Sequence, residues 1–140
     1  MRIIGSDKPD FYRAAAVIRE YLPDVLIMPE CKIIVDDNRY YGLVTPNGGT
    51  VIYDHVIRDR TVCNPEFIFT VISSLFTFAP IINAFVEQDN VASKRVLEGV
   101  GFIKTGILRQ EQSVDIYSMT AQEWQNNRIM RHFTKTTQNI

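Results

Sequence analysis

The chain has 140 residues, of which 46% are hydrophobic and 22% are charged, an ordinary composition for a folded protein. Fifteen basic and sixteen acidic residues give a net charge of −1, which excludes the strongly basic balance typical of nucleic-acid-binding domains. The length suits one domain, which we place at residues 1–133, followed by a frayed tail at residues 134–140.

The sequence also indicates a location. The apolar stretch at the start is too short for a signal peptide, and the apolar run at 67–82 is broken by polar residues and Pro80. The two cysteines, Cys31 and Cys63, form no metal-ligand cluster and need no disulfide. We therefore expect a cytoplasmic protein with no metal, and with neither a membrane nor nucleic acid as a partner.

The first half of the chain predicts one helix among four strands. Residues 2–4 form a short strand, and a helix at 7–21 follows, with Asp7 as its cap and Pro9 in its first turn. Turn residues separate three further strands, as in consecutive antiparallel hairpins. These strands are expected at residues 31–35, 40–45 and 50–57.

The second half opens with a helix that Asn64 caps, that Pro65 begins and that runs to about residue 78. Because this helix is apolar nearly all round, we expect it to be buried. A strand at 81–86 follows, so the chain crosses from the fourth strand to the fifth through a helix. Such a crossover makes the two strands parallel.

A shorter helix follows Asn90, places Ala92, Val96 and Val100 on one face with Leu97 beside them, and ends at Gly101. Strands at 103–108 and 114–120 are expected to pair as a closing hairpin. A last helix is expected at 121–133, and its apolar residues leave open whether it packs on its own domain or on a neighbouring copy.

The segment around Asn90 carries the most informative pattern. An apolar strand leads into Asn90-Val91-Ala92-Ser93, and Gly101-Phe102 follows the helix. This pattern resembles the Asn-x-x-Ser/Ala, helix, Gly-Phe signature of the GNAT (Gcn5-related) N-acetyltransferases. The run Tyr117-Ser118-Met119-Thr120, with Glu123-Trp124 shortly after it, is similar to the ribosomal-protein-type (Rim-like) branch. The resemblance implies an α/β (α+β) GNAT fold, with a mixed central sheet of about seven strands, splayed parallel strands 4 and 5, and flanking helices.

The resemblance also implies that acetyl-CoA is the co-substrate. The family binds pantetheine between the fourth and fifth strands, and pyrophosphate at a glycine-containing loop before the next helix. The cofactor-binding residues it implies here are Val56, Ile57, Arg58, Arg60, Thr61, Cys63, Asn64, Asn90 and Ser93. Thr61 and Cys63 stand where the family has glycines, and a β-branched threonine is poorly suited to positive φ. The loop is therefore a weakened or lost phosphate site, and Arg58 and Arg60 are candidates to compensate through side-chain charge.

Several of these residues have a plainer interpretation that remains open. The Asn90 side chain can simply cap its helix, and Ser93 can supplement that cap. Lys94 and Arg95 are candidates for pairing with cofactor phosphates, with a solvated helix face as the alternative.

Acetyl transfer to an amine needs a base for the acceptor and an acid for the departing thiolate. Candidate bases are Glu87 and the pair Asp54 and His55, which strand alternation places on opposite faces of the fourth strand. Tyr117 is a candidate acid, because Leu97 stands where many members of the family have a tyrosine.

Two functions follow from this sequence. The first is an N-acetyltransferase that moves the acetyl group of acetyl-CoA to an amine: a protein N-terminus, a lysine or a small amine. The alternative is a non-catalytic protein on the GNAT scaffold, with a structural or protein-interaction role, of the compact kind found in bacteriophage genomes. For that role the helix at 121–133 is the expected contact with a second copy, as a homodimer, or with another protein.

Overall fold

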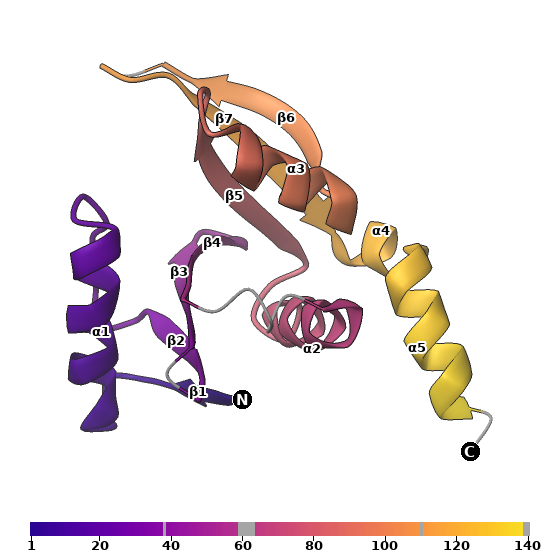
Figure 1. Cartoon of the computed structure of the whole chain (residues 1–140), viewed down its shortest axis with the longest axis horizontal. Helices are drawn as coiled ribbons and strands as arrows, with labels where there is room; N and C mark the ends of the chain where they lie inside the picture. The colour runs from indigo at the N-terminus through magenta and orange to yellow at the C-terminus, as the bar shows by residue number, and fades with distance from the viewer. Residues whose placement is uncertain (38, 59–63, 110, 139–140) are drawn as a thin grey trace. The chain divides into compact units, whose positions relative to one another are not determined.

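The computed structural model describes residues 1–37, 39–58, 64–109 and 111–138, with side chains up to residue 133. Internal contacts divide the chain into two units, residues 1–63 and 64–140 (Figure 1). Each unit is built around its own antiparallel strands. No helix in the described part of the chain is long and apolar enough to cross a membrane.

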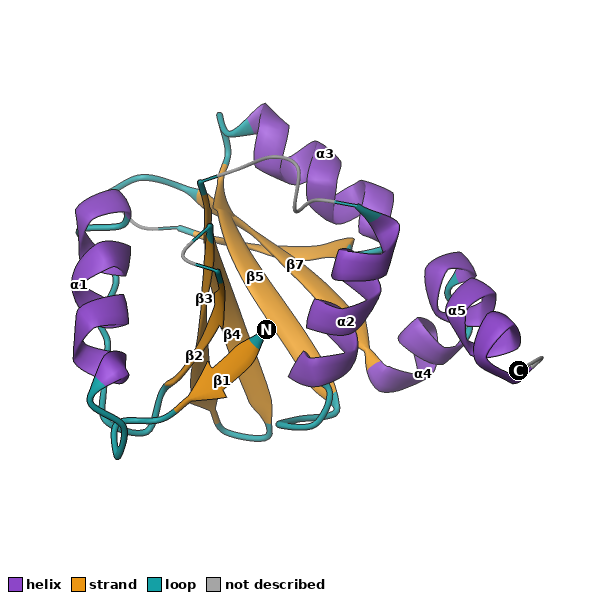
Figure 2. Cartoon of the chain, turned by 60° about the horizontal axis from the view of Figure 1, so that its bottom comes forward, coloured by secondary structure: helices purple, strands orange, loops and turns teal. Residues whose placement is uncertain are grey.

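The first unit consists of four antiparallel strands and one helix. Each strand pairs with the next in the sequence, and the helix lies along one face of the strands (Figure 2). In chain order the elements are β1 (Arg2–Ile4), α1 (Asp10–Tyr21), β2 (Lys32–Asp36), β3 (Tyr40–Asn47) and β4 (Thr50–Ile57).

The core of this unit lies between α1 and the strand face that the helix covers. Buried side chains recur along the helix at the spacing that places them on one side. They join the inward-facing residues of the strands in one apolar cluster, which contains Phe11, Ala14, Ala15, Ile18, Ile33, Val35, Tyr41, Leu43 and Val56.

Several boundaries in this unit differ from the sequence prediction, and β2 lies one residue later than expected. The helix begins at Asp10, with Pro9 at the N-cap position, so the predicted cap at Asp7 is wrong. The reason is a turn before the helix, in which the Lys8 N–H donates to the Gly5 carbonyl over 3.0 Å. Strand β3 runs on to Asn47, which pairs with Thr50 across a two-residue hairpin turn.

The second unit contains three strands and four helices. The strands are β5 (Ile81–Glu87), β6 (Ile103–Leu108) and β7 (Val114–Thr120), and β7 pairs with both others in antiparallel fashion. The helices are α2 (Pro65–Leu75), α3 (Val91–Val100), α4 (Ala121–Gln125) and α5 (Arg128–Gln138). Hydrogen bonds from α3 to β7 hold that helix against one face of these strands (Figure 1).

Both predicted helix starts in this unit are confirmed. The Phe67 N–H donates to Oδ1 of Asn64 over 2.9 Å, and the Ser93 N–H donates to Oδ1 of Asn90 over 3.2 Å. The predicted stop at Gly101 is also confirmed, because its φ of 116° lies in the left-handed region that favours glycine.

The predicted burial of α2 on nearly all sides is wrong. In α2 only Val71, Ile72 and Leu75 are buried, so this helix has one inward side and is not enclosed all round. In α3 the buried residues are Leu97 and Val100, whereas Val96 is 48% exposed. The strands under α3 select which of its apolar residues face inward, and composition alone does not show that choice.

The predicted last helix is two helices. A capping box starts α4, since Thr120 accepts from the Glu123 N–H and the Glu123 carboxylate accepts from the Thr120 N–H. Oδ1 of Asn127 then accepts the Ile129 N–H at the start of α5 over 2.9 Å. Helix α5 continues to Gln138, into the segment for which the sequence predicted a frayed tail.

Helices α4 and α5 pack on α2 of the same unit. Trp124 is buried, and its Nε1 donates to Oγ of Ser73 over 3.2 Å. The Phe133 ring lies 5.1 Å from the ring of Phe69. The sequence left open whether residues 121–133 pack on their own domain or on a neighbouring copy. The structure shows packing on their own domain.

Candidate functional site

Strand β4 presents two of the three candidate bases on opposite faces, as predicted, whereas the third, Glu87, is exposed at the end of β5. Asp54 pairs with Leu43, whose side chain belongs to the core under α1, so Asp54 lies on the α1 side. His55 pairs with Gly42 on the other side, and its ring lies 5.6 Å from the ring of Tyr53. Asp54 and His55 are both half-buried.

Their surroundings change the proton affinities of both groups. Burial raises the pKa of Asp54 to about 6, because a carboxylate is less stable away from water. Burial lowers the pKa of His55, because the imidazolium is disfavoured for the same reason. At neutral pH both side chains are therefore mainly in the form that can accept a proton.

Glycine at position 42 is required by the packing around His55. A Cβ atom there would lie 2.6 Å from the Tyr40 hydroxyl and 2.9 Å from Cε2 of Tyr53. Such distances are too short for real contacts, so a larger residue would displace the aromatic side chains beside His55.

The end of β4 and the start of α2 contain the other cofactor-binding candidates of this part of the chain. The Val56 side chain is buried in the α1 core, Ile57 is half-buried and the Arg58 side chain is exposed. The Arg58 N–H donates to the Arg39 carbonyl over 2.7 Å. The candidates Arg60, Thr61 and Cys63 lie outside the described residues.

The first turn of α2 offers few donors to a phosphate. Pro65 at the first position has no N–H, and the Phe67 N–H is taken by the Asn64 side chain. Glu66, between them, adds a negative charge to the same turn. Helix N-termini bind anions through free N–H groups, so this turn fits a pyrophosphate poorly.

The first turn of α3 is built around Asn90. Its Oδ1 accepts from the Ser93 N–H and its carbonyl accepts from the Lys94 N–H over 3.2 Å. The capping interpretation of Asn90 is thus confirmed. A role of Asn90 or Ser93 toward a cofactor stays a prediction, and the Asn90 amide group is the part of the cap that can still donate to a ligand.

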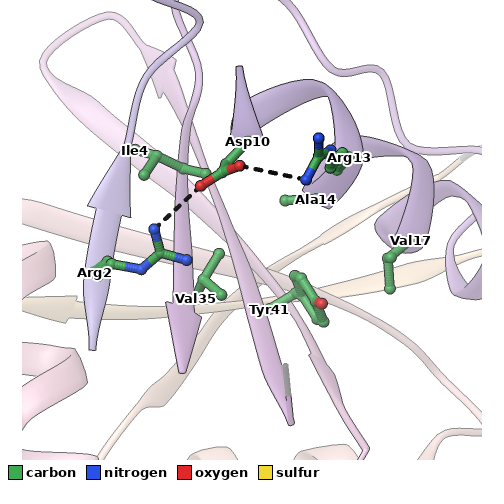
Figure 3. A pocket seen from close by; sticks show the side chains of 8 residues that line it. All are labelled: Arg2, Ile4, Asp10, Arg13, Ala14, Val17, Val35 and Tyr41. Carbon is green, nitrogen blue, oxygen red and sulfur yellow. Dashed lines mark hydrogen bonds and ion pairs between the residues drawn. The ribbon is translucent and has the colours of Figure 1, made fainter. Parts of the chain in front are cut away.

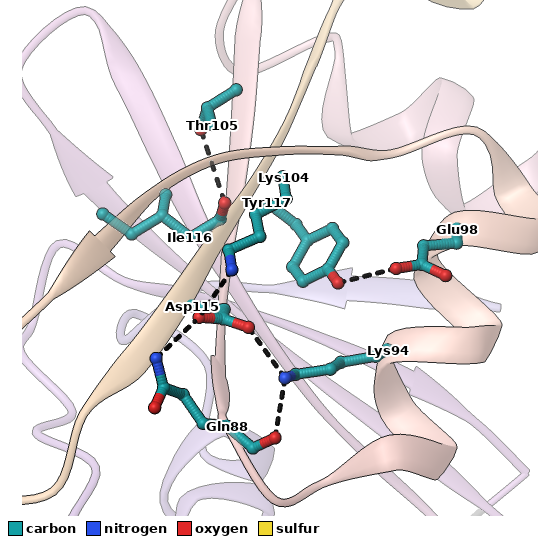
Figure 4. Close-up of polar contacts among 8 residues, drawn as sticks. All are labelled: Gln88, Lys94, Glu98, Lys104, Thr105, Asp115, Ile116 and Tyr117. Atoms are coloured by element: carbon teal, nitrogen blue, oxygen red, sulfur yellow. Dashed lines mark hydrogen bonds and ion pairs between the residues drawn. The ribbon is translucent and has the colours of Figure 1, made fainter.

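A buried carboxylate ties this turn to β7 (Figure 4). Asp115 is only 2% exposed, and its Oδ2 lies 2.7 Å from Nζ of Lys94. Lys104 Nζ lies 3.4 Å from its Oδ1, and Gln88 Nε2 donates to the same oxygen over 3.2 Å. Lys94 also donates to the Gln88 carbonyl over 2.6 Å. The hydrogen bond from Lys94 is the main reason that the pKa of Asp115 is lowered.

Sequence reasoning missed this cluster. Strand alternation was the signal that could have found it, because it places Asp115 on the same face as Tyr117 and Met119, which are both buried. The cluster gives Lys94 a role that neither interpretation included, since its half-buried side chain pairs with Asp115. This ammonium group is bound by the protein's own carboxylate, so Arg95, which is exposed, is the better phosphate candidate of the two.

The structure brings Tyr117 to helix α3. Its ring is buried, and its hydroxyl donates to Oε1 of Glu98 over 2.8 Å (Figure 4). The carboxylate at the hydroxyl raises the pKa of Tyr117 to about 12. The phenol is therefore protonated at neutral pH, and it is a weaker acid than an ordinary tyrosine.

Comparison with solved structures identifies the fold. Aminoglycoside acetyltransferase AAC(6')-Ib, in complex with coenzyme A and kanamycin, matches with a TM-score of 0.60 and 14% identity, over 89% of this chain and 96% of that chain. Mutant forms of the spermidine/spermine N-acetyltransferase SpeG from Vibrio cholerae match with a TM-score of 0.58 and 14% identity, over 83% and 80%. RimJ from Mycobacterium smegmatis, in complex with CoA-disulfide, matches with a TM-score of 0.58 and 15% identity, over 90% and 68%.

These matches confirm the predicted GNAT fold with its seven strands and flanking helices. No family model matches the sequence, and no curated protein matches it. At identities this low, the likeness establishes the fold alone.

Proposed function

We propose that the protein is an N-acetyltransferase that uses acetyl-CoA and acetylates an amine. The observation that carries this proposal is the likeness of its fold to acetyltransferases, two of which hold coenzyme A or its disulfide. Acetyl-CoA supplies an acetyl group activated as a thioester. The acceptor is a protein N-terminus, a lysine or a small amine.

The residues of this chain supply the proton chemistry. Asp54, with a pKa of about 6, and His55, with a lowered pKa, can each accept the proton that the attacking amine loses. A base is most effective when its pKa lies close to the working pH, which favours Asp54. Tyr117 is the proposed proton donor, and its hydrogen bond to Glu98 has to open before the phenol can protonate the departing thiolate, because that bond makes it a weak acid.

The cofactor's phosphates are proposed to be bound mainly by arginine side chains and less by the backbone N–H groups of the first turn of α2. That turn offers few donors, whereas the side chains of Arg58 and Arg95 are exposed. Arginine can replace backbone N–H groups here, because its guanidinium binds phosphate through two parallel hydrogen bonds. Asn90 and Ser93 are proposed to contact the pantetheine arm.

An acceptor screen tests the activity. Release of the free thiol from acetyl-CoA would be followed with four amines: a peptide with a free N-terminus, a lysine peptide blocked at its N-terminus, spermidine and kanamycin. We expect release that depends on one class of amine and that Asp54→Asn slows by about 10²- to 10⁴-fold, the usual contribution of a positioned base.

Asp37→Asn is the matched control for that variant. Asp37 is exposed in the turn between β2 and β3, and its φ of 45° is one that asparagine tolerates. The Asp37→Asn variant should therefore release the thiol at the wild-type rate. Equal rates for both variants would remove Asp54 from the mechanism, and the same comparison with His55→Gln would then test the second candidate.

One observation favours the second candidate function, a non-catalytic protein on the same scaffold. The start of α2, where the family binds pyrophosphate, has a proline, an occupied N–H and an acidic side chain. If acetyl-CoA does not bind, this poor fit is the reason, and the protein's role lies in contacts with other proteins.

A further inference from the structure

A pocket of about 290 Å³ lies within the first unit, between α1 and the strands β1 to β3 (Figure 3). Its volume is at the lower end of the range for small-molecule sites, about 300–1,000 Å³. Neither Asp54 nor His55 lines it. The pocket is therefore separate from the residues proposed for acetyl transfer.

The floor of the pocket is apolar. It is formed by Ile4, Ala14 and Val35, which are nearly inaccessible to solvent, with Val17 one helical turn farther along α1. The hollow exists because Ala14 presents only a methyl group where the neighbouring turns of the helix carry larger side chains. An apolar group that fills it would displace water from an apolar surface, which is favourable.

The rim of the pocket is positively charged. Two arginines approach one carboxylate: Arg2 Nη1 lies 3.2 Å from Oδ2 of Asp10, and Arg13 Nη1 lies 3.9 Å from its Oδ1 (Figure 3). The Arg2 side chain is 63% exposed and that of Arg13 is 86% exposed. Such exposed ion pairs are weak, so both guanidinium groups can turn toward another anion.

These two features select a ligand class. An apolar floor under a rim with one excess positive charge complements a molecule with a short apolar body and one negative group. A guanidinium group binds a carboxylate through two parallel N–H···O hydrogen bonds, which a compact ammonium group cannot form. We propose that the pocket binds a small amphipathic carboxylate, whose apolar part contacts Ala14 and Val35 and whose carboxylate is held by Arg2 and Arg13.

This ligand would link β1 to α1, because its two arginine contacts come from different elements. Binding would therefore stabilise the folded chain in proportion to ligand concentration. Since the pocket residues take no part in the proposed chemistry, the affinity for acetyl-CoA should not change, and a failure of either proposal leaves the other intact.

Sodium octanoate is a suitable probe, titrated into the full chain while methyl resonances are followed by NMR. We expect saturable shifts confined to Ile4, Ala14, Val17 and Val35. Butyrate, which lacks the apolar length, and octylammonium, which has the opposite charge, should each bind at least tenfold more weakly. No saturation with octanoate, or equal binding of octylammonium, would overturn the proposal.

Charge variants test the rim. The double variant Arg2→Gln/Arg13→Gln should weaken octanoate binding at least tenfold, whereas Arg19→Gln, an exposed position on the same helix outside the pocket, should not. Val17→Phe is a second, independent test, because it narrows the pocket without a change of charge. It should also weaken octanoate binding at least tenfold. Unchanged affinity in both the double variant and Val17→Phe would refute this site.

Discussion

Asp115 of β7 and Lys94 of α3 form an ion pair of 2.7 Å, although Asp115 is almost completely withdrawn from solvent. Two further donors, Lys104 and Gln88, complete the shell of this carboxylate. A buried charge is tolerated only when its partners satisfy it. The pair thus holds the first turn of α3, where Asn90 and Ser93 lie, in a fixed position on the strand.

Removal of this charge should destabilise the protein. We expect Asp115→Asn to shift chemical unfolding to a lower denaturant concentration at pH 7, because it leaves the half-buried Lys94 ammonium without its counter-charge. Asp89→Asn, an exposed change beside the same helix, is the control and should leave the midpoint in place.

The same pair makes a prediction about pH. Because its folded pKa is lowered, Asp115 contributes stability above the unfolded value, near 4, and this contribution is lost as pH falls through the folded pKa. The stability of Asp115→Asn should therefore fall less than that of wild type between pH 5 and pH 2. Parallel curves for the two proteins would show that the pair contributes nothing.

Two variants of Asn90 separate its capping of α3 from a contact with acetyl-CoA. Asn90→Ala should cost about 1 kcal/mol of stability, because Ser93 loses its N-cap acceptor. Asn90→Ser should keep most of this stability, since serine also caps helices well, but it removes the carboxamide. If the carboxamide contacts acetyl-CoA, both variants bind it weakly. Wild-type affinity in Asn90→Ser would limit Asn90 to capping.

Asp54 should show opposite effects on stability and activity. Its pKa rises from 3.8 to about 6, so the folded state binds protons more tightly than the unfolded state, and stability declines as pH rises from about 4 to 6. A shift of about two pKa units corresponds to at most about 3 kcal/mol above pH 6.

The variant Asp54→Asn should therefore be more stable than wild type at pH 7 while it transfers acetyl groups more slowly. Urea unfolding at pH 4 and pH 7 measures the first effect, and the gain should disappear at the lower pH. A variant that is less stable than wild type at pH 7 would contradict the conclusion that desolvation disfavours the charged form of Asp54.

The packing of α5 gives a prediction that concerns the C-terminal segment. Phe133→Ala should lower the stability of the monomer by about 1–2 kcal/mol, less than a fully buried phenylalanine, because its ring is half-buried against Phe69. Arg131→Ala, on the exposed side of the same helix, should change it little. A concentration-dependent unfolding midpoint, altered by Phe133→Ala, would instead indicate that this residue lies in a contact between copies.

Local chemistry explains which parts of the structure the sequence could predict. Asn64-Pro65, Asn90 and Gly101 define helix ends by hydrogen bonds or φ angles that lie within a few residues, and each was confirmed. The start of α1 escaped prediction because the turn at Gly5 to Lys8 competed with a plausible cap at Asp7.

Contacts between residues that lie far apart in the sequence could not be predicted from local patterns. The buried side of α3 depends on the strands beneath it, so Leu97 and not Val96 faces inward. The bonds from Asp115 to Lys94 and from Tyr117 to Glu98 join a strand to a helix earlier in the chain. The pocket under Arg2 and Arg13 likewise requires β1 and α1 to be placed side by side.

Calorimetric titration of the whole chain with acetyl-CoA tests the central claim most directly, with Arg58→Ala and Asn90→Ser beside wild type and Arg19→Ala as the control. The account predicts saturable binding that Arg58→Ala and Asn90→Ser weaken and that the control leaves unchanged. No heat and no thermal shift at millimolar acetyl-CoA would contradict it, and would show that the GNAT fold of this chain serves a function other than acetyl transfer.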